Sequence, residues 1–559
     1  MQDVPRYICD CVPFMLLNPN YFSTDPATLA CRLDHRHFHI RSDFFHGVIL
    51  LILFSSVHVL IVFTMNLIFF NFLATCLCQS FVLKNFEPEL PPSTSNLLRR
   101  DACENSPTSR SCWGEYSIDT DYYAETPHTG VTRGIVQLLL RNRVKALTTC
   151  RAEYWLTAEN ITLSLDGYER QVLAYNGSIP GPTLFADWGK NTSGHSSVWE
   201  LTRLGDNLAI HVTNNMKYNG TSVHWHGVRQ LGNNEYDGVP GVTQCPIPPG
   251  QSFTYKFQAT QYGSTWYHSH FSLQYTDGLY GALLINGPAT ADYDEDLGMM
   301  FLSDWPHEPI SEIWESTRQK GAPSLQNGLI NGTNTYDCSH SSDLKCIGNG
   351  KKFETVFDAG KKYRIGLTNV ATNGHFQFSI DGHSLTVISN DLVPIVPYQT
   401  DSILINMGQR YEVIVEANAE PGDYWLRGGW QMACSANDNP ENITGIVRYD
   451  ATSTDNPTTT GITVGDSCGD EPLASLVPHL ALDVTSLDTF VEEEVGIAIH
   501  DYLVWTINSS SLYLNWSEPT NLRVWDHDKV FPVDYNALSV EASTISTLPC
   551  YCCNANYFF

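Results

Sequence analysis

Alternation of apolar and polar residues is the main pattern in the middle of the chain. Residues 153–166 (EYWLTAENITLSLD), 207–214 (NLAIHVTN) and 252–259 (SFTYKFQA) each switch between the two classes at every second position. This period is typical of β-strands with one buried face, whereas the three- and four-residue spacing of amphipathic helices is scarce. Short strands separated by Gly, Pro and Asn predict an all-β protein built of β-sandwiches.

A long apolar run near the start breaks this pattern. Residues 48–82 are almost continuously apolar, which is longer than the roughly 20 residues of one membrane span. In one interpretation Met65 is the true start, residues 67–77 are a signal-peptide core, and Arg99-Arg100 is a processing site. In the other, residues 48–82 anchor the chain in a membrane. We favour the first, and with it secretion and no membrane attachment of the mature protein.

Composition narrows the classes of function. The chain has 559 residues, 42% of them hydrophobic, so it can bury several cores. Asp and Glu outnumber Lys and Arg by 60 to 32, and a net charge of −28 argues against nucleic-acid binding and favours a small neutral or cationic partner. Sixteen cysteines favour an oxidising compartment, and Cys338 and Cys346 are close enough in sequence to pair. Eight Asn-x-Ser/Thr sequons point to the secretory route: Asn160, Asn176, Asn191, Asn219, Asn331, Asn442, Asn508 and Asn515.

Two His-x-His pairs carry the candidate chemistry. They lie in TSVHWHGV (221–228) and WYHSHF (266–271), both rich in β-formers. Residues two apart on a strand share a face, so His224 pairs with His226, and His268 with His270. Their α-carbons are separated by about 6.5 Å, which suits adjacent metal ions better than one small ion. Imidazole is a good ligand for copper, zinc, iron or nickel, and the chain has no HExxH zinc helix.

The residues flanking these pairs resemble a known family. Residues 224–250 and 263–288 are similar to the first two copper motifs of multicopper oxidases, specifically fungal laccases. Milder similarity extends from about Cys103 to about Ser539. The resemblance implies tandem cupredoxin-like Greek-key domains at 101–288 and 289–465, the start of a third at 466–543 with a strand pair in 503–516, an N-terminal extension at 1–100 and an aberrant tail at 544–559. It also implies disulfides Cys103–Cys112 and Cys434–Cys468.

The same resemblance implies roles for the histidines and two carboxylates. His224 would bind a type 2 copper, His226 and His268 one type 3 copper, and His270 the other. Asp237, in EYDGVPG, matches an acidic residue that supplies protons near the type 2 copper; a turn-forming Asp is the alternative. Glu416 matches a carboxylate that accepts a proton from a phenol; an exposed strand residue without a role is the alternative.

The activity implied is oxidation of small phenolic or aromatic compounds with reduction of dioxygen to water, by a copper-dependent enzyme that we expect to be a monomer. Two alternatives remain: an oxidase of ascorbate or a metal ion, and a non-catalytic copper-binding protein. The family's type 1 copper motifs, HPxHLHGH and HCHxxxH, do not occur in the sequence. We therefore expect the chain as written to show no phenol oxidation, and expect Cys245 to lack its usual partner.

Two segments depart from the family pattern. Residues 134–152 and 190–205 interrupt strands that the flanking sequence completes without them. Translated introns or genuine surface insertions would both explain them. In either case we expect them to project from the sandwich as poorly ordered loops.

Overall fold

The computed structural model describes most of the chain from Arg151 onward, and the account below concerns that part. The described residues are 151–188, 206–230, 232–287, 289–463, 465–479, 494–499, 503–512, 514–525 and 531. The predicted signal peptide or anchor, the pair Cys103–Cys112, the segment 190–205 and the tail lie outside them. Among the described helices, none combines the length and apolar character needed to span a membrane.

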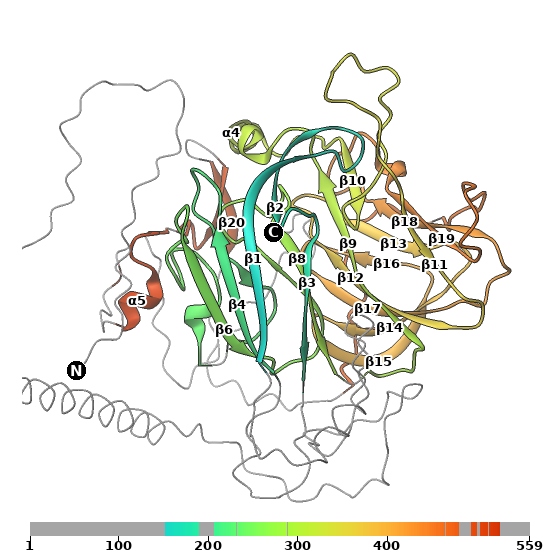
Figure 1. Cartoon of the computed structure of the whole chain (residues 1–559), viewed down its shortest axis with the longest axis horizontal. Helices are drawn as coiled ribbons and strands as arrows, with labels where there is room; N and C mark the ends of the chain where they lie inside the picture. The colour runs from blue at the N-terminus through green and yellow to red at the C-terminus, as the bar shows by residue number, and fades with distance from the viewer. Residues whose placement is uncertain are drawn as a thin grey trace, which may run out of the picture. The chain divides into compact units, whose positions relative to one another are not determined.

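The first sandwich consists of two four-stranded sheets in the orders β2-β1-β4-β6 and β3-β8-β7-β5 (Figure 1). The first sheet contains β1 (Arg151–Leu163), β2 (Arg170–Tyr175), β4 (Asn207–Asn214) and β6 (Ser252–Gln258). The second contains β3 (Gly181–Asp187), β5 (His224–Trp225), β7 (Gly263–His268) and β8 (Tyr280–Asn286). The strands predicted from alternation are confirmed, with Leu208, Ile210 and Val212 of β4 buried. Arg151 and Ala152, expected in a projecting loop, instead begin β1 and pair with β4, so this part of the insertion prediction is wrong.

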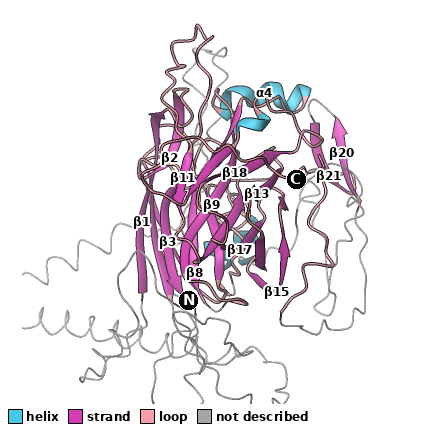
Figure 2. Ribbon diagram, turned by 90° about the vertical axis from the view of Figure 1, so that its right-hand side faces the viewer, coloured by secondary structure: helices cyan, strands magenta, loops and turns pink. Residues whose placement is uncertain are grey.

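The second sandwich follows with sheets of six and five strands. The larger has the order β10-β9-β12-β17-β14-β15 and the smaller β11-β19-β18-β13-β16. The larger contains β9 (Glu295–Trp305), β10 (Asn327–Ile330), β12 (Lys362–Asn369), β14 (Leu385–Asn390), β15 (Val393–Thr400) and β17 (Arg410–Glu416). The smaller contains β11 (Phe353–Val356), β13 (Phe376–Ile380), β16 (Ile403–Ile405), β18 (Asp423–Trp430) and β19 (Thr444–Arg448). Helices are few among the described residues, as Figure 2 shows, and α4 (Ile310–Lys320) is the longer of the two α-helices in that part of the chain; the all-β prediction is confirmed.

A hairpin and a short helix represent the region after the second sandwich. Strand β20 (Val495–Ile499) pairs with β21 (Leu503–Ile507), and α5 spans Thr520–Trp525. The prediction of a strand pair within 503–516 is wrong for the described residues. Asn508 and Ser509 adopt left-handed φ values of 50° and 64°, which turn the chain and end the strand. Backbone N–H groups of Thr520 and Asn521 donate to the first sandwich, at Gly241 and Val242.

The three largest hydrophobic clusters of the described residues hold the sandwiches. One lies inside each sandwich, and the third joins them by combining residues of β2, β7 and β8 with residues of β9 and β10. Its buried members are Val172, Ala174, Ile179, Trp266, Tyr280, Ala282, Leu284, Met299, Phe301, Trp305, Leu329 and Val370. Because this shared core contains Trp266 of β7, the second sandwich supports a strand that bears a candidate metal ligand.

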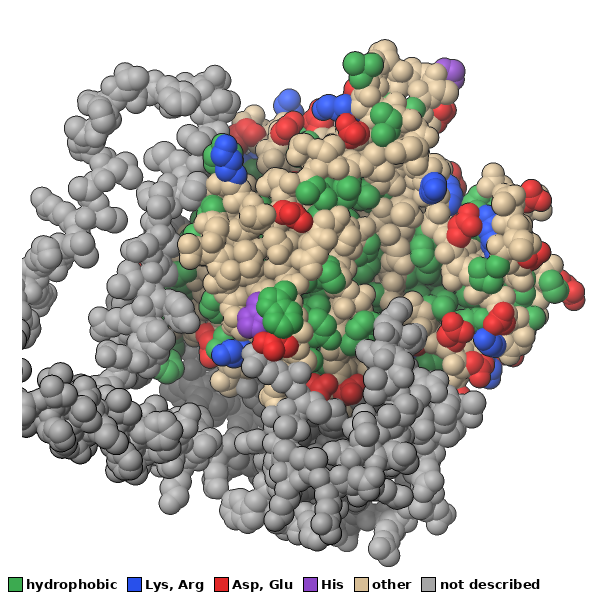
Figure 3. Space-filling view, viewed as in Figure 1, with side chains coloured by type: hydrophobic (Ala, Val, Ile, Leu, Met, Phe, Trp, Pro, Cys, Tyr) green, Lys and Arg blue, Asp and Glu red, His purple; other side chains and the backbone are tan. Residues whose placement is uncertain are grey.

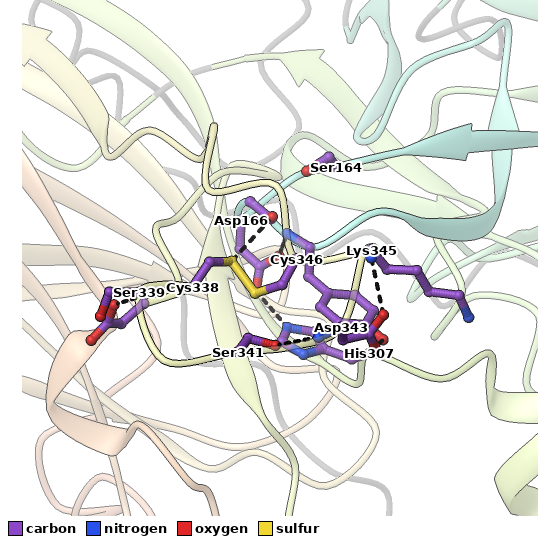
Figure 4. The surroundings of a disulfide bond; sticks show 12 residues. Ser164, Asp166, His307, Cys338, Ser339, Ser341, Asp343, Lys345 and Cys346 are labelled. Atoms are coloured by element: carbon purple, nitrogen blue, oxygen red, sulfur yellow. Dashed lines mark hydrogen bonds and ion pairs between the residues drawn. A yellow bond between two sulfur atoms is a disulfide. The ribbon is translucent and has the colours of Figure 1, made fainter.

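Disulfides link loops at the periphery. Cys338–Cys346 and Cys434–Cys468 are both formed, as predicted. Figure 4 shows the first of them beside Asp166 and His307, whose Nε2 lies 2.9 Å from the Asp166 carboxylate. Cys245 is also disulfide-bonded, so the expectation that it lacks a partner is wrong.

The surface carries interspersed charges. On the face in Figure 3, acidic and basic side chains of the described residues lie scattered among apolar and uncharged ones. Buried charge is rarer and is hydrogen-bonded. Asp304, at the end of β9, is 2% exposed and accepts backbone N–H groups of Thr372 and Asn373 at 2.9 and 2.8 Å. Burial raises its pKa from 3.8 to about 6, against the effect of these hydrogen bonds.

Leu329 tests the shared core. It is fully buried there, so Leu329→Ala should lower the free energy of unfolding by about 2–5 kcal/mol through lost apolar burial and a residual cavity. Leu344→Ala is the control, because that side chain is 95% exposed and its truncation should change stability by no more than about 0.5 kcal/mol. Chemical denaturation of both variants measures the difference. If Leu329→Ala lowered stability as little as Leu344→Ala does, burial of Leu329 in the core between the sandwiches would contribute no measurable stability.

Asp304 should make stability depend on pH. Its pKa is higher in the folded chain than in the unfolded chain, so protonation stabilises the folded state below about pH 4, and this stabilisation is lost as pH rises through 6. In Asp304→Asn the titration is absent. The unfolding free energy of the wild type minus that of the variant should therefore fall by roughly 2.4 kcal/mol between pH 4 and pH 7. Denaturation curves of both proteins at pH 4 and pH 7 measure this difference in unfolding free energy. A difference that is the same at both pH values would contradict the prediction.

Candidate metal centre

Pairing between β5 and β7 brings the two His-x-His segments together. The strands are antiparallel, with His224 opposite His268 and Trp225 opposite Tyr267. Trp225 and Tyr267 are fully buried in the core of the first sandwich, so the histidines, at alternate positions, face the other way. The backbone N–H of His226 donates to the carbonyl of Trp266 at 3.0 Å, which continues the pairing beyond β5.

The four imidazoles converge on one space. Ring centroids lie 5.7 Å apart for His224 and His226, 5.4 Å for His224 and His268, and 5.3 Å for His224 and His270. The separations are 5.4 Å for His226 and His268 and 5.9 Å for His268 and His270. One ring nitrogen from each of His224, His226 and His268 lies within 4.8 Å of the others. His270 borders this group through its ring.

Hydrogen bonds to backbone carbonyls orient two of the rings. His224 Nδ1 lies 2.8 Å from the carbonyl oxygen of Asp237, and His268 Nδ1 lies 3.0 Å from that of Ser269. A carbonyl only accepts, so each Nδ1 carries the proton and each Nε2 keeps a free lone pair. This is how metal-binding histidines are usually held. His268 Nε2 lies 3.2 Å from His226 Nδ1, so these two nitrogens can face one ion.

The environment keeps three of the imidazoles, those of His226, His268 and His270, neutral. Burial is the main reason that the pKa of His226 is lowered to about 2, and the positive charge of Arg410 contributes next. Burial also holds the pKa of His268 well below its ordinary value and lowers that of His270. A metal ion requires the unprotonated ring. Donor type, orientation and charge state therefore fit a metal such as copper.

Asp237 lies beside His224 and also forms a turn. Its Oδ1 is 3.4 Å from His224 Nδ1, so the structure brings this carboxylate to the centre. The alternative interpretation, a turn-forming Asp, fits as well, because Asp237 ends a 3-10 turn over Asn234–Tyr236. Gly238 follows with φ of +81°, and a Cβ there would lie 1.8 Å from the carbonyl oxygen of Val223. The turn therefore requires glycine after Asp237.

Glu416 is not brought to the histidines. It is exposed at the last position of β17, and its strand neighbour is Lys362. The first residue of β17, Arg410, is the one that approaches the centre. Six residues of extended chain, about 20 Å, separate the two positions. The proposed role of Glu416 stays a prediction.

Two residues near the centre were not singled out as contributors from the sequence. Trp266 is buried, and its ring stacks 4.0 Å from His268 and 5.0 Å from His226. Arg410 lies within the region of milder family similarity, between about Cys103 and about Ser539. Its position against the first sandwich comes from tertiary packing, for which the local sequence has no signal.

Comparison with known proteins agrees with this geometry. Two family models, both described as Multicopper oxidase, match residues 201–290 and 296–452. Laccase-2 of Botryotinia fuckeliana is 58% identical over 439 residues, which cover 78% of this chain and 69% of the relative. Dihydrogeodin oxidase of Aspergillus terreus is 39% identical over 81% of this chain and 72% of its own length.

A solved structure extends the likeness to the fold. The crystal structure of laccase from Botrytis aclada superposes with a TM-score of 0.68 at 56% identity, covering 78% of this chain and 74% of that protein. The sandwiches are therefore cupredoxin-like domains, as the sequence predicted. With a relative at this identity and coverage, and with the multicopper oxidase motifs matched in sequence, this chain belongs to the multicopper oxidase family and is of the fungal laccase type.

Proposed function

We propose that His224, His226, His268 and His270 hold copper and that the protein oxidises small phenolic or other aromatic compounds with dioxygen as electron acceptor. Family membership implies a copper-dependent oxidoreductase. The observation that supports the site is the convergence of four imidazoles at ring separations of 5.3–5.9 Å among the measured pairs. The family's laccases support the substrate class, because those relatives carry that name.

The individual roles that we propose follow the family resemblance. His226 and His268 would share one copper of a type 3 pair, which their 3.2 Å nitrogen separation supports. His270 would hold the other type 3 copper, and His224 the type 2 copper. Bound copper would supply one-electron transfer between the reductant and dioxygen.

The surrounding protein would orient the rings and supply protons. The Asp237 carbonyl fixes the tautomer of His224, and its carboxylate, 3.4 Å from the same ring, could hold a proton at Oδ1. Trp266 covers two imidazoles with an apolar face, which excludes water from that side.

Secretion is also part of the proposal. The described disulfides Cys338–Cys346 and Cys434–Cys468 support folding in an oxidising compartment. Expression in a yeast host with assay of medium and cells tests it. Retention of the folded chain in the membrane fraction would instead favour the anchor at residues 48–82.

Copper binding gives a direct test. The chain should bind copper, and His268→Ala should weaken binding at least roughly tenfold because His268 Nε2 and His226 Nδ1 face the same ion. His383→Ala is the matched control, since His383 is equally buried but bonds to Asp381 and Tyr449 in the second sandwich. Dialysis against buffered copper followed by elemental analysis measures both. Equal retention of copper by the two variants would disprove the assignment of His268.

Substrate class requires a turnover assay. A chimera of residues 1–465 with the corresponding C-terminal part of Laccase-2 should consume oxygen several times faster with a phenol than with ascorbate or ferrous iron. Faster uptake on ascorbate or iron would favour the alternative oxidases.

A further inference from the structure

Strand β17 of the second sandwich contacts both histidine-bearing segments of the first. Arg410 and Glu412 are two residues apart and share a face of the strand. Glu412 Oε1 accepts the backbone N–H of Ser264, in β7, at 2.6 Å. Arg410 meets the other segment at Gly227, directly after His226: a Cβ on Gly227 would lie 2.2 Å from Arg410 Nη2.

The guanidinium of Arg410 is held in place. The residue is 5% exposed, and its Nη1 lies 3.0 Å from the carbonyl oxygen of Gly408 and 2.7 Å from Asp391 Oδ1. Gly408 in turn borders the metal centre, because a Cβ there would lie 3.2 Å from His226 Cε1. The positive charge therefore has a fixed position next to two backbone segments that border the His226 ring, at Gly227 and at Gly408.

This charge is not cancelled at the imidazole. Asp391 is its ion-pair partner, but that carboxylate is 38% exposed, so solvent screens it more than it screens the buried guanidinium. The guanidinium lies against Gly227, directly after His226, and is hydrogen-bonded to Gly408, which borders the His226 ring. A fixed positive charge at this place opposes a doubly charged ion on His226 more than a singly charged one.

We propose that Arg410 is a positioning residue that fixes a positive charge beside His226 and thereby favours cuprous over cupric copper at that ligand. The inference rests on the proposed function, since it requires copper at the histidine centre. The equilibrium concerned is the one-electron reduction of Cu²⁺ to Cu⁺, with the electron supplied by the reductant. Raising the potential of a copper near His226 would help it to accept that electron.

The test compares affinities for both oxidation states. Dissociation constants for Cu⁺ and Cu²⁺ are measured in the full chain by competition with chromophoric chelators. In Arg410→Gln the ratio of the Cu²⁺ to the Cu⁺ constant should fall about tenfold, equivalent to a potential lower by about 59 mV. Arg410→Lys, which keeps the charge, should restore most of the ratio. Arg448→Gln should not change it, because Arg448 is equally buried and pairs with Glu354 and Asp423.

Asp391→Asn is a second variant, which should change the ratio of the two dissociation constants in the opposite direction. The Asn side chain can still accept the backbone N–H of Arg410, as Asp391 Oδ1 does at 2.9 Å, while the counter-charge is removed, so the ratio should rise. If the affinities for both ions changed together in every variant and the ratio stayed constant, the role of Arg410 would be purely structural. That result would overturn the inference. If the wild-type chain bound neither ion, the proposed function itself would fail.

Discussion

The antiparallel register between β5 and β7 is the constraint on which the metal centre depends. With His224 opposite His268, the pleat directs Trp225 and Tyr267 into the core and the histidines out of it. A slip of one residue would exchange the two sets and bury imidazoles in place of aromatic rings. The full burial of Trp225 and Tyr267 therefore specifies the register, and the register places the ligands.

The second sandwich also supports the candidate metal centre. Its core with the first sandwich includes Trp266, which stacks on two imidazoles. Its strand β17 adds a hydrogen bond to β7 through Glu412 and a charge beside His226 through Arg410. Rigid support of this kind keeps metal ligands in a fixed geometry. The two sandwiches thus share no sheet across residue 288, yet residues of both lie beside the candidate metal centre.

Errors in the sequence analysis have local causes. The strand pair expected in 503–516 overlooked two left-handed residues, Asn508 and Ser509, which no strand pattern reveals. The boundary of the first insertion was drawn from family continuity, yet Arg151 and Ala152 extend β1 because β4 offers them partners.

The sequence alone determined the strands, the four histidines and their shared faces, because period-two alternation is a local property of the backbone. It also indicated the family, since the residues around both histidine pairs are distinctive. The tertiary structure decided what depends on contacts distant in sequence. These are the orientation of His224 by the Asp237 carbonyl, the covering of the rings by Trp266, and the approach of Arg410 to Gly227, 183 positions apart in the chain. Such contacts arise from the packing of one sandwich on another, where shape and burial over many residues select the neighbours, and no pattern within a single strand encodes them.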